Sequence, residues 1–223
     1  MKLTLSVTTI PSRLEKLYGL VDSFALGDDC RSDWKEHEQG HIRTWADDEA
    51  GLELIAYCTE PYDDAKPDPR LTFGHKRNVL LALARGYMVS SFDDDDRPHP
   101  NYRELILPHC HEGVDVIGYK VACYGYAQTN GQFDPSIMEP ADVSIKYDGW
   151  YNDRNGFKYV RCPHHIVPVR AEHVRAIGFK PMHHGEDHEY SIRMRDSGLL
   201  KTEVYIDEFM YVYLFNAKKK KGE

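Results

Sequence analysis

The sequence predicts one α/β domain in which helices flank a mostly parallel central sheet, with a small antiparallel elaboration beside it. Two observations carry this prediction. Short apolar runs alternate with helical periodicity along the chain, first over residues 3–24 and again over residues 75–92. The 223 residues are enough for one substantial core and do not require a second domain. Residues 1–223 are therefore predicted to form a single domain, whose ligands should bind where the strands end.

Composition is that of a soluble globular protein. Hydrophobic residues make up 41% of the chain and charged residues 29%, an ordinary balance for a folded domain. No apolar run approaches the roughly 20 residues that a membrane span needs, and residues 1–11 do not form a signal peptide. The protein is therefore expected to be cytoplasmic. The five cysteines, an odd number without CxxC spacing, argue against a zinc knuckle or a disulfide framework.

Net charge argues weakly against a general nucleic-acid binder. The chain has 28 basic and 36 acidic residues, a formal net charge of -8, whereas phosphate contacts need clustered lysine and arginine. The one basic run lies in residues 216–223, and such a run at the end of a chain is typical of a solvated tail.

The first elements are a strand followed directly by a helix. Leu3, Leu5 and Val7 alternate with polar residues, a period-two pattern that predicts a strand. Ser12 and Glu15 form an S-x-x-E capping box, after which apolar residues recur at helical spacing. The turn between the two elements should direct backbone N–H groups towards an anion at the edge of the sheet.

Residues 27–51 are predicted to be a polar insertion. They are acid-rich, contain two tryptophans and lack clear periodicity, so this segment is expected to hold a short helix and is a candidate lid or acceptor surface. Residues 52–58 fit a second strand, and residues 60–74, with three prolines, a rigid surface loop. A helix is then predicted over residues 75–85, stopped by Gly86 as a left-handed residue after the helix end.

The rest of the chain continues the alternation of strands and helices. The predicted elements are strands at residues 87–92, 114–119, 159–170 and 204–215, helices at residues 101–111, 171–177 and 185–197, and an antiparallel elaboration over residues 122–157. Aromatic residues in the elaboration could stack on a sugar or a base, although most aromatic clusters are simply core.

Four consecutive aspartates follow the predicted strand at residues 87–92. Residues two apart on an extended chain point the same way, so Asp93 and Asp95 share one face, and Asp94 and Asp96 share the other. Paired carboxylates suit Mg²⁺ or Mn²⁺. Acidic runs are usually solvated loops, but a position at the end of an apolar strand favours a ligand site.

Two predicted helix starts carry charged residues. Lys76 and Arg77 lie in a first turn, where the helix dipole disfavours cations, so either an anion lies nearby or the pair is solvated. Glu186 and Asp187 open the helix at residues 185–197, where the dipole alone favours acids.

With these features in order, the chain resembles GT-A fold nucleotide-sugar glycosyltransferases, most closely family 2, whose fold is Rossmann-like. The resemblance runs from Leu3 to about Phe215. It rests on four segments, which are VTTIPSR with the following helix, HKRNVLLALARGYMVSSFDDDD with its DxD motif, PVRAEHVRAIGF, and GEDHEYSIRMRDSG. Each segment alone is weak, but their order and spacing together are fairly specific.

The resemblance implies a nucleotide-diphosphate sugar as donor, with a UDP-sugar favoured, and Mn²⁺ or Mg²⁺ as cofactor. Asp93 would contact the donor ribose or sugar and share the metal with Asp95, which would bind it on the diphosphate. The residues implied to bind the donor are Thr9, Pro11, Arg13, Glu60, Arg77, Asp93 and Asp94. Glu60 departs from the family pattern, since Cys-Thr-Glu-Pro stands where the family often has an Asp-Asp-Gly-Ser-like turn. The run of four acids also leaves the register open, so that Asp94 and Asp96 could serve instead.

The resemblance also implies the catalytic pair. Asp187 would take the proton of the acceptor hydroxyl, with Glu186 beside it, in a hexosyl or pentosyl transfer that favours inversion. Histidines near these segments could supply a third metal ligand, and the two named candidates are His165 and His184. The acceptor is open among a glycan, a protein side chain and a hydroxylated DNA base.

Two other classes of function remain in competition with this reading. Clustered acids and histidines also serve two-metal chemistry, as in a nucleotidyltransferase or a nuclease. A GT-A-like module could also keep the fold and bind a donor without catalysis, because a fold alone does not fix a function.

Overall fold

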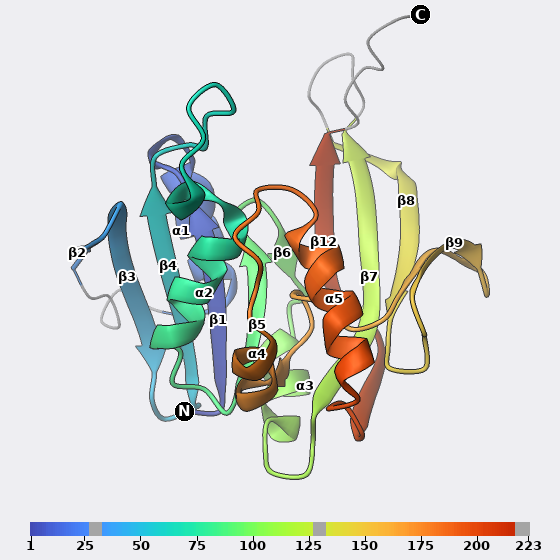
Figure 1. The fold of residues 1–223 in the computed structure, drawn as a ribbon. Coiled ribbons are helices and arrows are strands. Elements are labelled where there is room, and N and C mark those ends of the chain that lie inside the picture. Colours follow the sequence, from blue (N-terminus) through green and yellow to red (C-terminus); the bar gives the residue numbers. More distant parts are fainter. Residues whose placement is uncertain (27–32, 127–132, 217–223) are drawn as a thin grey trace, which may run out of the picture.

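The computed structural model of the protein describes residues 1–26, 33–126 and 133–216 (Figure 1). The start of the predicted insertion and the predicted tail from residue 217 onwards lie outside the described residues. The strands are β1 Leu3–Thr9, β2 Lys35–His37, β3 Gly40–Asp47, β4 Leu52–Thr59, β5 Met88–Asp93, β6 Arg97–Pro98, β7 Val116–Tyr126, β8 Phe133–Val143, β9 Trp150–Arg154, β10 Phe157–Arg161, β11 Val169–Arg170 and β12 Glu203–Asn216. The helices are α1 Leu14–Ser23, α2 Phe73–Leu83, α3 Tyr102–Ile106, α4 Ala171–Ile177 and α5 Glu186–Ser197, with 3₁₀ turns at Pro11–Arg13, Pro69–Leu71 and Leu107–His109.

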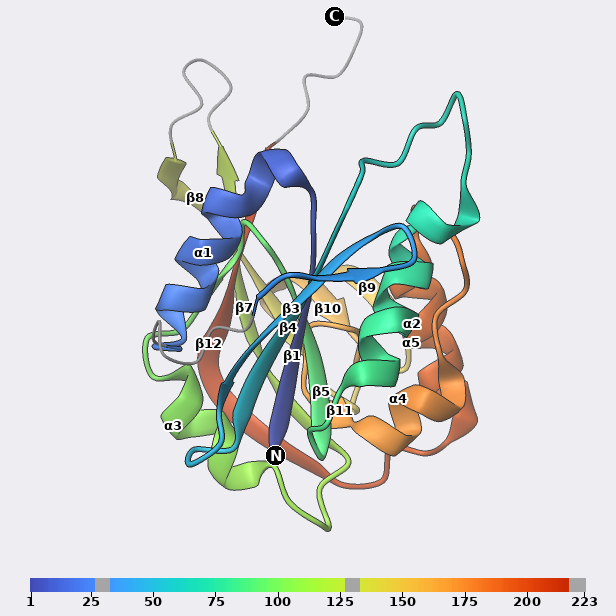
Figure 2. The same ribbon diagram turned by 90° about the vertical axis from the view of Figure 1, so that its left-hand side faces the viewer.

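The centre of the sheet is parallel, as predicted. β1 lies between β4 and β5 and pairs in parallel with both, so that Leu3 lies opposite Leu52 on one side and Met88 on the other. Figures 1 and 2 together show α1 and α3 on one face of the sheet and α2, α4 and α5 on the other. This is the layered α/β architecture that the alternation of strand and helix patterns predicted.

β1 is buried on both faces, although its sequence alternates in the manner of a half-buried strand. Its inward polar side chains therefore need partners. Thr4 donates a hydrogen bond of 2.6 Å to the Glu53 carboxylate, and the Ser6 and Ser91 hydroxyls lie 2.7 Å apart. These contacts tie β1 to β4 and to β5 at positions that water cannot reach.

Gly86 is needed for space rather than for a left-handed conformation. α2 ends at Leu83, before the predicted limit of residue 85, and Gly86 is not among the described glycines with positive φ. A Cβ at Gly86 would lie 2.4 Å from the backbone nitrogen of Thr4. The prediction that Gly86 stops the helix in a left-handed conformation was therefore wrong, and the residue instead lets two backbones approach.

The second half of the chain adds the antiparallel elaboration that was predicted. β11 pairs antiparallel with both β5 and β7, and β7 pairs antiparallel with β8. β12 returns in parallel beside β7 and also reaches β6 (Figure 1). β12 thereby brings its C-terminal half next to the segment that follows β5.

The described part of the polar insertion, residues 33–51, contains strands and no helix, and the expected short helix could be checked only there. β2 and β3 form an antiparallel hairpin, and β3 pairs antiparallel with β4 along its whole length. The two buried residues of β3, Ile42 and Trp45, are three apart, a spacing that does not show strand periodicity. The pairing with β4 decides the conformation here, and local sequence does not reveal it.

Two further expectations were wrong in detail. No side-chain capping hydrogen bond forms at the start of α1, because Pro11–Arg13 make a 3₁₀ turn and Arg13 occupies the N-cap, so Ser12 and Glu15 do not form a capping box. The strand predicted at residues 159–170 is two short strands, β10 and β11, separated by a turn. That turn carries His164 and His165.

Candidate functional site

The candidate site lies where the carboxyl ends of β1 and β5 meet. These strands are parallel neighbours with Thr8 opposite Asp93, so the residues that follow them emerge at the same edge of the sheet. Phe92, the last apolar residue of β5, is fully buried and stacks on Tyr211 of β12 with 4.5 Å between ring centres. A packed core residue thus fixes the start of the acidic run.

The four aspartates alternate between accessible and buried, as the sequence predicted. The side chains of Asp93 and Asp95 are 39% and 32% exposed, whereas Asp94 and Asp96 are at most 1% exposed. Asp96 accepts hydrogen bonds from the Tyr211 hydroxyl at 2.6 Å and from the Leu214 backbone N–H at 2.8 Å. Asp96 is therefore an anchor for β12, and it also lines a cleft together with Trp150 and Tyr159.

Asp94 is almost fully buried, although it belongs to the wall of the charged cleft that also contains Arg13. It accepts a hydrogen bond of 2.6 Å from the Thr9 hydroxyl and forms an ion pair with Arg13. Burial raises the pKa of Asp94 to about 6, against the opposing effects of Thr9 and Arg13. Thr9 and Asp94 therefore help to hold the Arg13 guanidinium in place.

Cations face the two accessible aspartates. Arg13 lies 2.5 Å from the Asp95 carboxylate, and the Lys16 ammonium lies 3.3 Å from the same group. On the other side, the buried Arg77 guanidinium lies 3.5 Å from Asp93. Partial desolvation in the cleft and the neighbouring Asp95 carboxylate raise the pKa of Asp93, although Arg77 opposes this shift. Of the two alternatives for the cations of α2, a nearby anion is therefore present for Arg77, as a carboxylate of the protein.

Arg77 also reaches the first turn of α5. Its Nε donates a long hydrogen bond of 3.4 Å to the Glu186 carboxylate, and both side chains are buried. Burial raises the pKa of Glu186, although Arg77 opposes this shift. Asp187 is the next residue, and its Oδ1 accepts a hydrogen bond of 2.8 Å from the His188 backbone N–H. The two acids thus differ, since Glu186 is tied to Arg77 and lines one cleft, whereas Asp187 lines two.

A close backbone contact sets the position of α5 relative to α2. The Gly74 N–H donates to the Met182 carbonyl at 3.2 Å, and a Cβ at Gly74 would lie only 1.7 Å from the Lys180 carbonyl oxygen. Only glycine fits this position without movement of the main chain. Nearby, His183 is stacked between Tyr62 and Phe73. The segment that leads into Glu186 is therefore held against the start of α2.

Two clefts meet at the acidic residues. One, with a cavity volume of about 440 Å³, is lined by charged residues that include Arg13, Arg77 and Asp95. The other, of about 480 Å³, has mainly apolar and aromatic walls, among them Val121, Trp150 and Tyr159. The residues that line both clefts are Asp93, His165, Asp187 and Tyr213. Asp93 and Asp187 therefore lie where a ligand in one cleft would face a ligand in the other.

The remaining predicted residues lie around these clefts. Pro11 and Glu60 line a third hollow, of about 500 Å³, beside the β2–β3 hairpin. His184 is exposed and lines the charged cleft, whereas His165 lines both the charged and the apolar clefts. The structure thus gathers most of the candidates at one edge of the sheet, with Pro11 and Glu60 in a separate hollow.

The donor set at this edge fits a hard divalent cation in kind. Asp93 and Asp95 offer accessible carboxylates on one cleft, as such an ion prefers. Both carboxylates are in ion pairs with arginine, and a diphosphate entering the cleft would give Arg13 and Arg77 an alternative partner. Asp93 and Asp95 are therefore the residues that would hold the ion.

Sequence reasoning missed several residues that shape this site. Lys16 lies one turn into α1 and faces Asp95, while Tyr211 on β12 donates to Asp96 and, at 3.3 Å, accepts from the Asp93 N–H. Only the spacing of Lys16 from Arg13, three residues on a helix, could have indicated their common face. Nothing in the local sequence links Tyr211 to residues more than 110 positions away.

Lys76, next to Arg77, is 2% exposed and forms no ion pair with any described residue. Burial lowers its pKa to about 8 from 10.5, so between these pH values the unfolded chain binds more protons than the folded one. The free energy of unfolding should therefore rise between pH 8 and pH 10.5, by at most about 3 kcal/mol.

Lys76→Met should remove that rise and stabilise the protein at pH 7, because no charge is then buried. Denaturant unfolding at a series of pH values measures this. The matched control is Lys66→Met in an exposed loop, which should keep the wild-type pH dependence. If the free energy of unfolding changes with pH in the same way in wild type and in Lys76→Met, the prediction is wrong.

Comparison with known proteins identifies the fold. The chain is similar to S. aureus TarS, with a TM-score of 0.57 and 14% identity over 96% of this chain and 37% of that one. For TarS 1–349 in complex with UDP-GlcNAc the TM-score is 0.55, at 17% identity over 100% of this chain and 60% of the other. For TarS 1–349 in complex with UDP the TM-score is 0.56, at 14% identity over 96% of this chain and 61% of the other. The chain thus has a GT-A-like glycosyltransferase fold and spans between 37% and 61% of these solved chains.

Other comparisons add no assignment. No protein-family model matches the chain, and no curated protein matches it by sequence. Within the described residues, no helix combines the length and the apolar character that crossing a bilayer requires.

Proposed function

We propose that this protein is a glycosyltransferase, related most closely to family 2, that moves a hexosyl or pentosyl group from a UDP-sugar to an acceptor hydroxyl with inversion. The observation that supports this most is the meeting of a charged and an apolar cleft at Asp93 and Asp187. The charged cleft would hold the donor and the apolar cleft the acceptor, so that one carboxylate lies at the boundary to activate the hydroxyl. The solved complexes of TarS with UDP and UDP-GlcNAc add support for the donor class.

The charged cleft has the groups that a diphosphate requires. Arg13, Lys16 and Arg77 come from different elements and converge on Asp93 and Asp95. In the proposed complex these cations turn from the carboxylates to the phosphate oxygens, where an arginine can make paired hydrogen bonds. The cations also stabilise the negative charge that the leaving diphosphate gains as the glycosidic bond breaks.

A Mn²⁺ or Mg²⁺ ion is part of the proposal, with Asp93 and Asp95 as its ligands. When bound, such an ion supplies Lewis-acid stabilisation of the diphosphate. The hollow lined by Pro11 and Glu60 is the proposed position of the nucleoside, because Pro11 is only two residues from Arg13, which lines the charged cleft.

Asp187 is the proposed base. Its carboxylate lines both clefts, and a carboxylate within hydrogen-bond reach of the acceptor hydroxyl takes the proton as the oxygen attacks. Glu186, the neighbouring acid of α5, accepts a hydrogen bond from Arg77 and lines only the charged cleft, so it is not the proposed base. A base on the acceptor side of the sugar fits direct displacement, which inverts the anomeric carbon. The acceptor itself, a glycan, a protein side chain or a hydroxylated DNA base, and the cytoplasmic location stay predictions.

Thermal unfolding with a panel of nucleoside diphosphates, each with and without Mn²⁺, tests the donor assignment. A ligand at about 100 times its Kd adds about 2.7 kcal/mol of stability, so UDP with Mn²⁺ should raise the Tm measurably. Asp95→Ala should lose the metal-dependent part of this shift. Asp48→Ala, which changes an aspartate that is 80% exposed and outside the clefts, should keep it. Absence of a shift with every diphosphate, or an equal shift in Asp95→Ala, would count against the proposal.

A further inference from the structure

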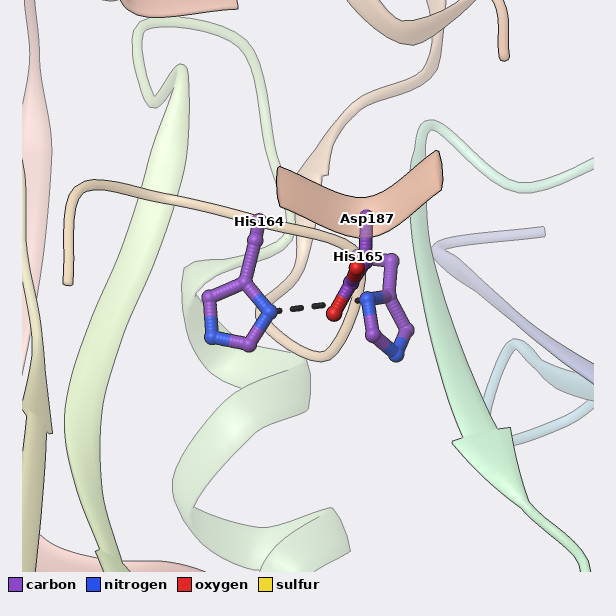
Figure 3. A group of neighbouring side chains, drawn as sticks. All are labelled: His164, His165 and Asp187. Carbon is purple, nitrogen blue, oxygen red and sulfur yellow. Dashed lines mark hydrogen bonds between the residues drawn. The ribbon is translucent and has the colours of Figure 1, made fainter. Parts of the chain in front are cut away.

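A group of three side chains lies at the junction of the two clefts, apart from the acidic run. His164, His165 and Asp187 each offer one ligand atom, and these atoms lie within 4.8 Å of one another. Figure 3 shows the three side chains directed towards a common point, with the histidines coming from the turn before β11 and Asp187 from the first turn of α5. In the described part of the chain, this is the group of histidine, cysteine and acidic residues with metal-binding spacing.

The spacing of the two imidazoles suits a common ion. Their Nδ1 atoms lie 3.5 Å apart. Two nitrogen ligands at about 2.0–2.1 Å from a tetrahedral ion are separated by roughly 3.4 Å, so little movement would be needed. Both rings point the same nitrogen inward, and at most one of those nitrogens can donate to the other when the rings are neutral.

The surroundings of the two rings differ. His164 is buried, and its ring is 5.2 Å from that of Trp150. His165 lines both clefts, and its Nε2 is buried without a hydrogen-bond partner among the described residues. Each neutral imidazole has an unprotonated nitrogen, the atom that coordinates a cation.

We infer that His164, His165 and Asp187 form a binding site for a divalent first-row transition-metal ion. Two imidazole nitrogens and one carboxylate oxygen favour Mn²⁺, Fe²⁺, Co²⁺ or Zn²⁺ over Mg²⁺, which prefers oxygen ligands alone. The site is distinct from the acidic run, whose ligands are carboxylates only.

The site does not depend on the proposed function, although both use Asp187. A carboxylate has two oxygens with about four acceptor positions. Oδ1 of Asp187 already accepts from the His188 N–H. The carboxylate can therefore bind an ion and still accept a hydrogen bond from an acceptor hydroxyl. Variants of the histidines test the ion alone, because neither histidine is assigned a part in the transfer.

The test is a Co²⁺ titration of the chelator-stripped full chain, followed by calorimetry and by the visible absorption of cobalt bound to nitrogen. The titration is made in an excess of Mg²⁺, which would fill the acidic run, and we expect one equivalent of Co²⁺ to bind. His165→Gln and His164→Gln should each weaken binding by at least about 10–100-fold and change the absorption. Circular dichroism and the Tm of each variant establish that it is folded.

Two control variants make the result decisive. His184→Ala changes an exposed histidine of the charged cleft, and Asp95→Ala changes the acidic run, so both should bind Co²⁺ with the wild-type affinity. If the folded histidine variants bind as tightly as wild type, or if Mg²⁺ competes equally, the two rings are only a hydrogen-bonded pair and the inference is wrong. If affinity falls in Asp95→Ala instead, the ion belongs to the acidic run. UDP binding, measured on the same samples without metal, shows separately whether the proposed donor cleft is intact.

Discussion

Asp187→Asn should lower the turnover of sugar transfer by about 10²–10⁴-fold, because an amide cannot take the proton of the attacking hydroxyl. The side chain keeps its size and its hydrogen bond from the His188 N–H, so the start of α5 should not move. Donor affinity should stay unchanged, since the cations that face the diphosphate are on other elements. The measurement is single-turnover transfer to a hydroxyl acceptor, together with calorimetry of UDP binding.

The matched control for this variant is Asp196→Asn. Asp196 is on the same helix, is 61% exposed and pairs with Arg195, far from both clefts along α5. It should transfer sugar at the wild-type rate. Wild-type turnover in Asp187→Asn would show that another group takes the proton. A parallel loss of UDP binding would point instead to a role on the donor side.

Gly86→Ala should be among the most destabilising single substitutions in this protein. The added Cβ would lie 2.4 Å from the Thr4 nitrogen and 2.6 Å from the Met88 carbonyl oxygen, both main-chain atoms between β1 and β5. Since these atoms belong to the central parallel strands, the main chain must shift to relieve the contact. We expect a loss of at least about 3 kcal/mol in the free energy of unfolding, measured in urea.

Gly19→Ala supplies the comparison. Gly19 is within α1, and the nearest atom to an added Cβ is the Arg97 side chain at 3.5 Å, an ordinary contact. Replacing a helical glycine by alanine should stabilise the protein by about 0.5–1 kcal/mol. Similar effects of the two substitutions would mean that Gly86 is not under steric constraint and that the strands tolerate more separation than the structure indicates.

The sequence predicted the elements whose own residue pattern is clear. β1, β4 and β5 were found within two residues of their limits, and α4 agrees at both ends with its predicted range. The strands β2 and β3 could not be predicted, since β3 is defined by its pairing with β4, and β2 by its pairing with β3, rather than by their own periodicity. The single strand predicted at residues 159–170 was wrong because Pro163 and Pro168, which cannot donate a ladder hydrogen bond, lie between β10 and β11.

The candidate site, too, could be predicted only in part from the sequence. The sequence predicted that Asp93 and Asp95 differ from Asp94 and Asp96, and the observed burial agrees. The physical reason differs, because β5 ends at Asp93 and a turn follows, in which the Asp96 N–H donates to the Asp93 carbonyl at 3.1 Å. His165 was named as a candidate ligand from the sequence. Its approach to Asp187 could not be predicted, because it depends on a turn where the sequence had predicted a strand. The roles of these residues in binding and catalysis stay predictions for the experiments above.

The contact of Gly74 with the main chain at Lys180 and Met182 bears on how such a protein can diversify. Because backbone atoms make the contact, its spacing is independent of the side chains that line either cleft. Descendants of this sequence could exchange those side chains, and with them the preferred sugar or acceptor, while the relative placement of α2 and α5 is inherited unchanged. Substitutions among the side chains that line the clefts could then change the specificity, because a single glycine keeps the two helices in the same relative position.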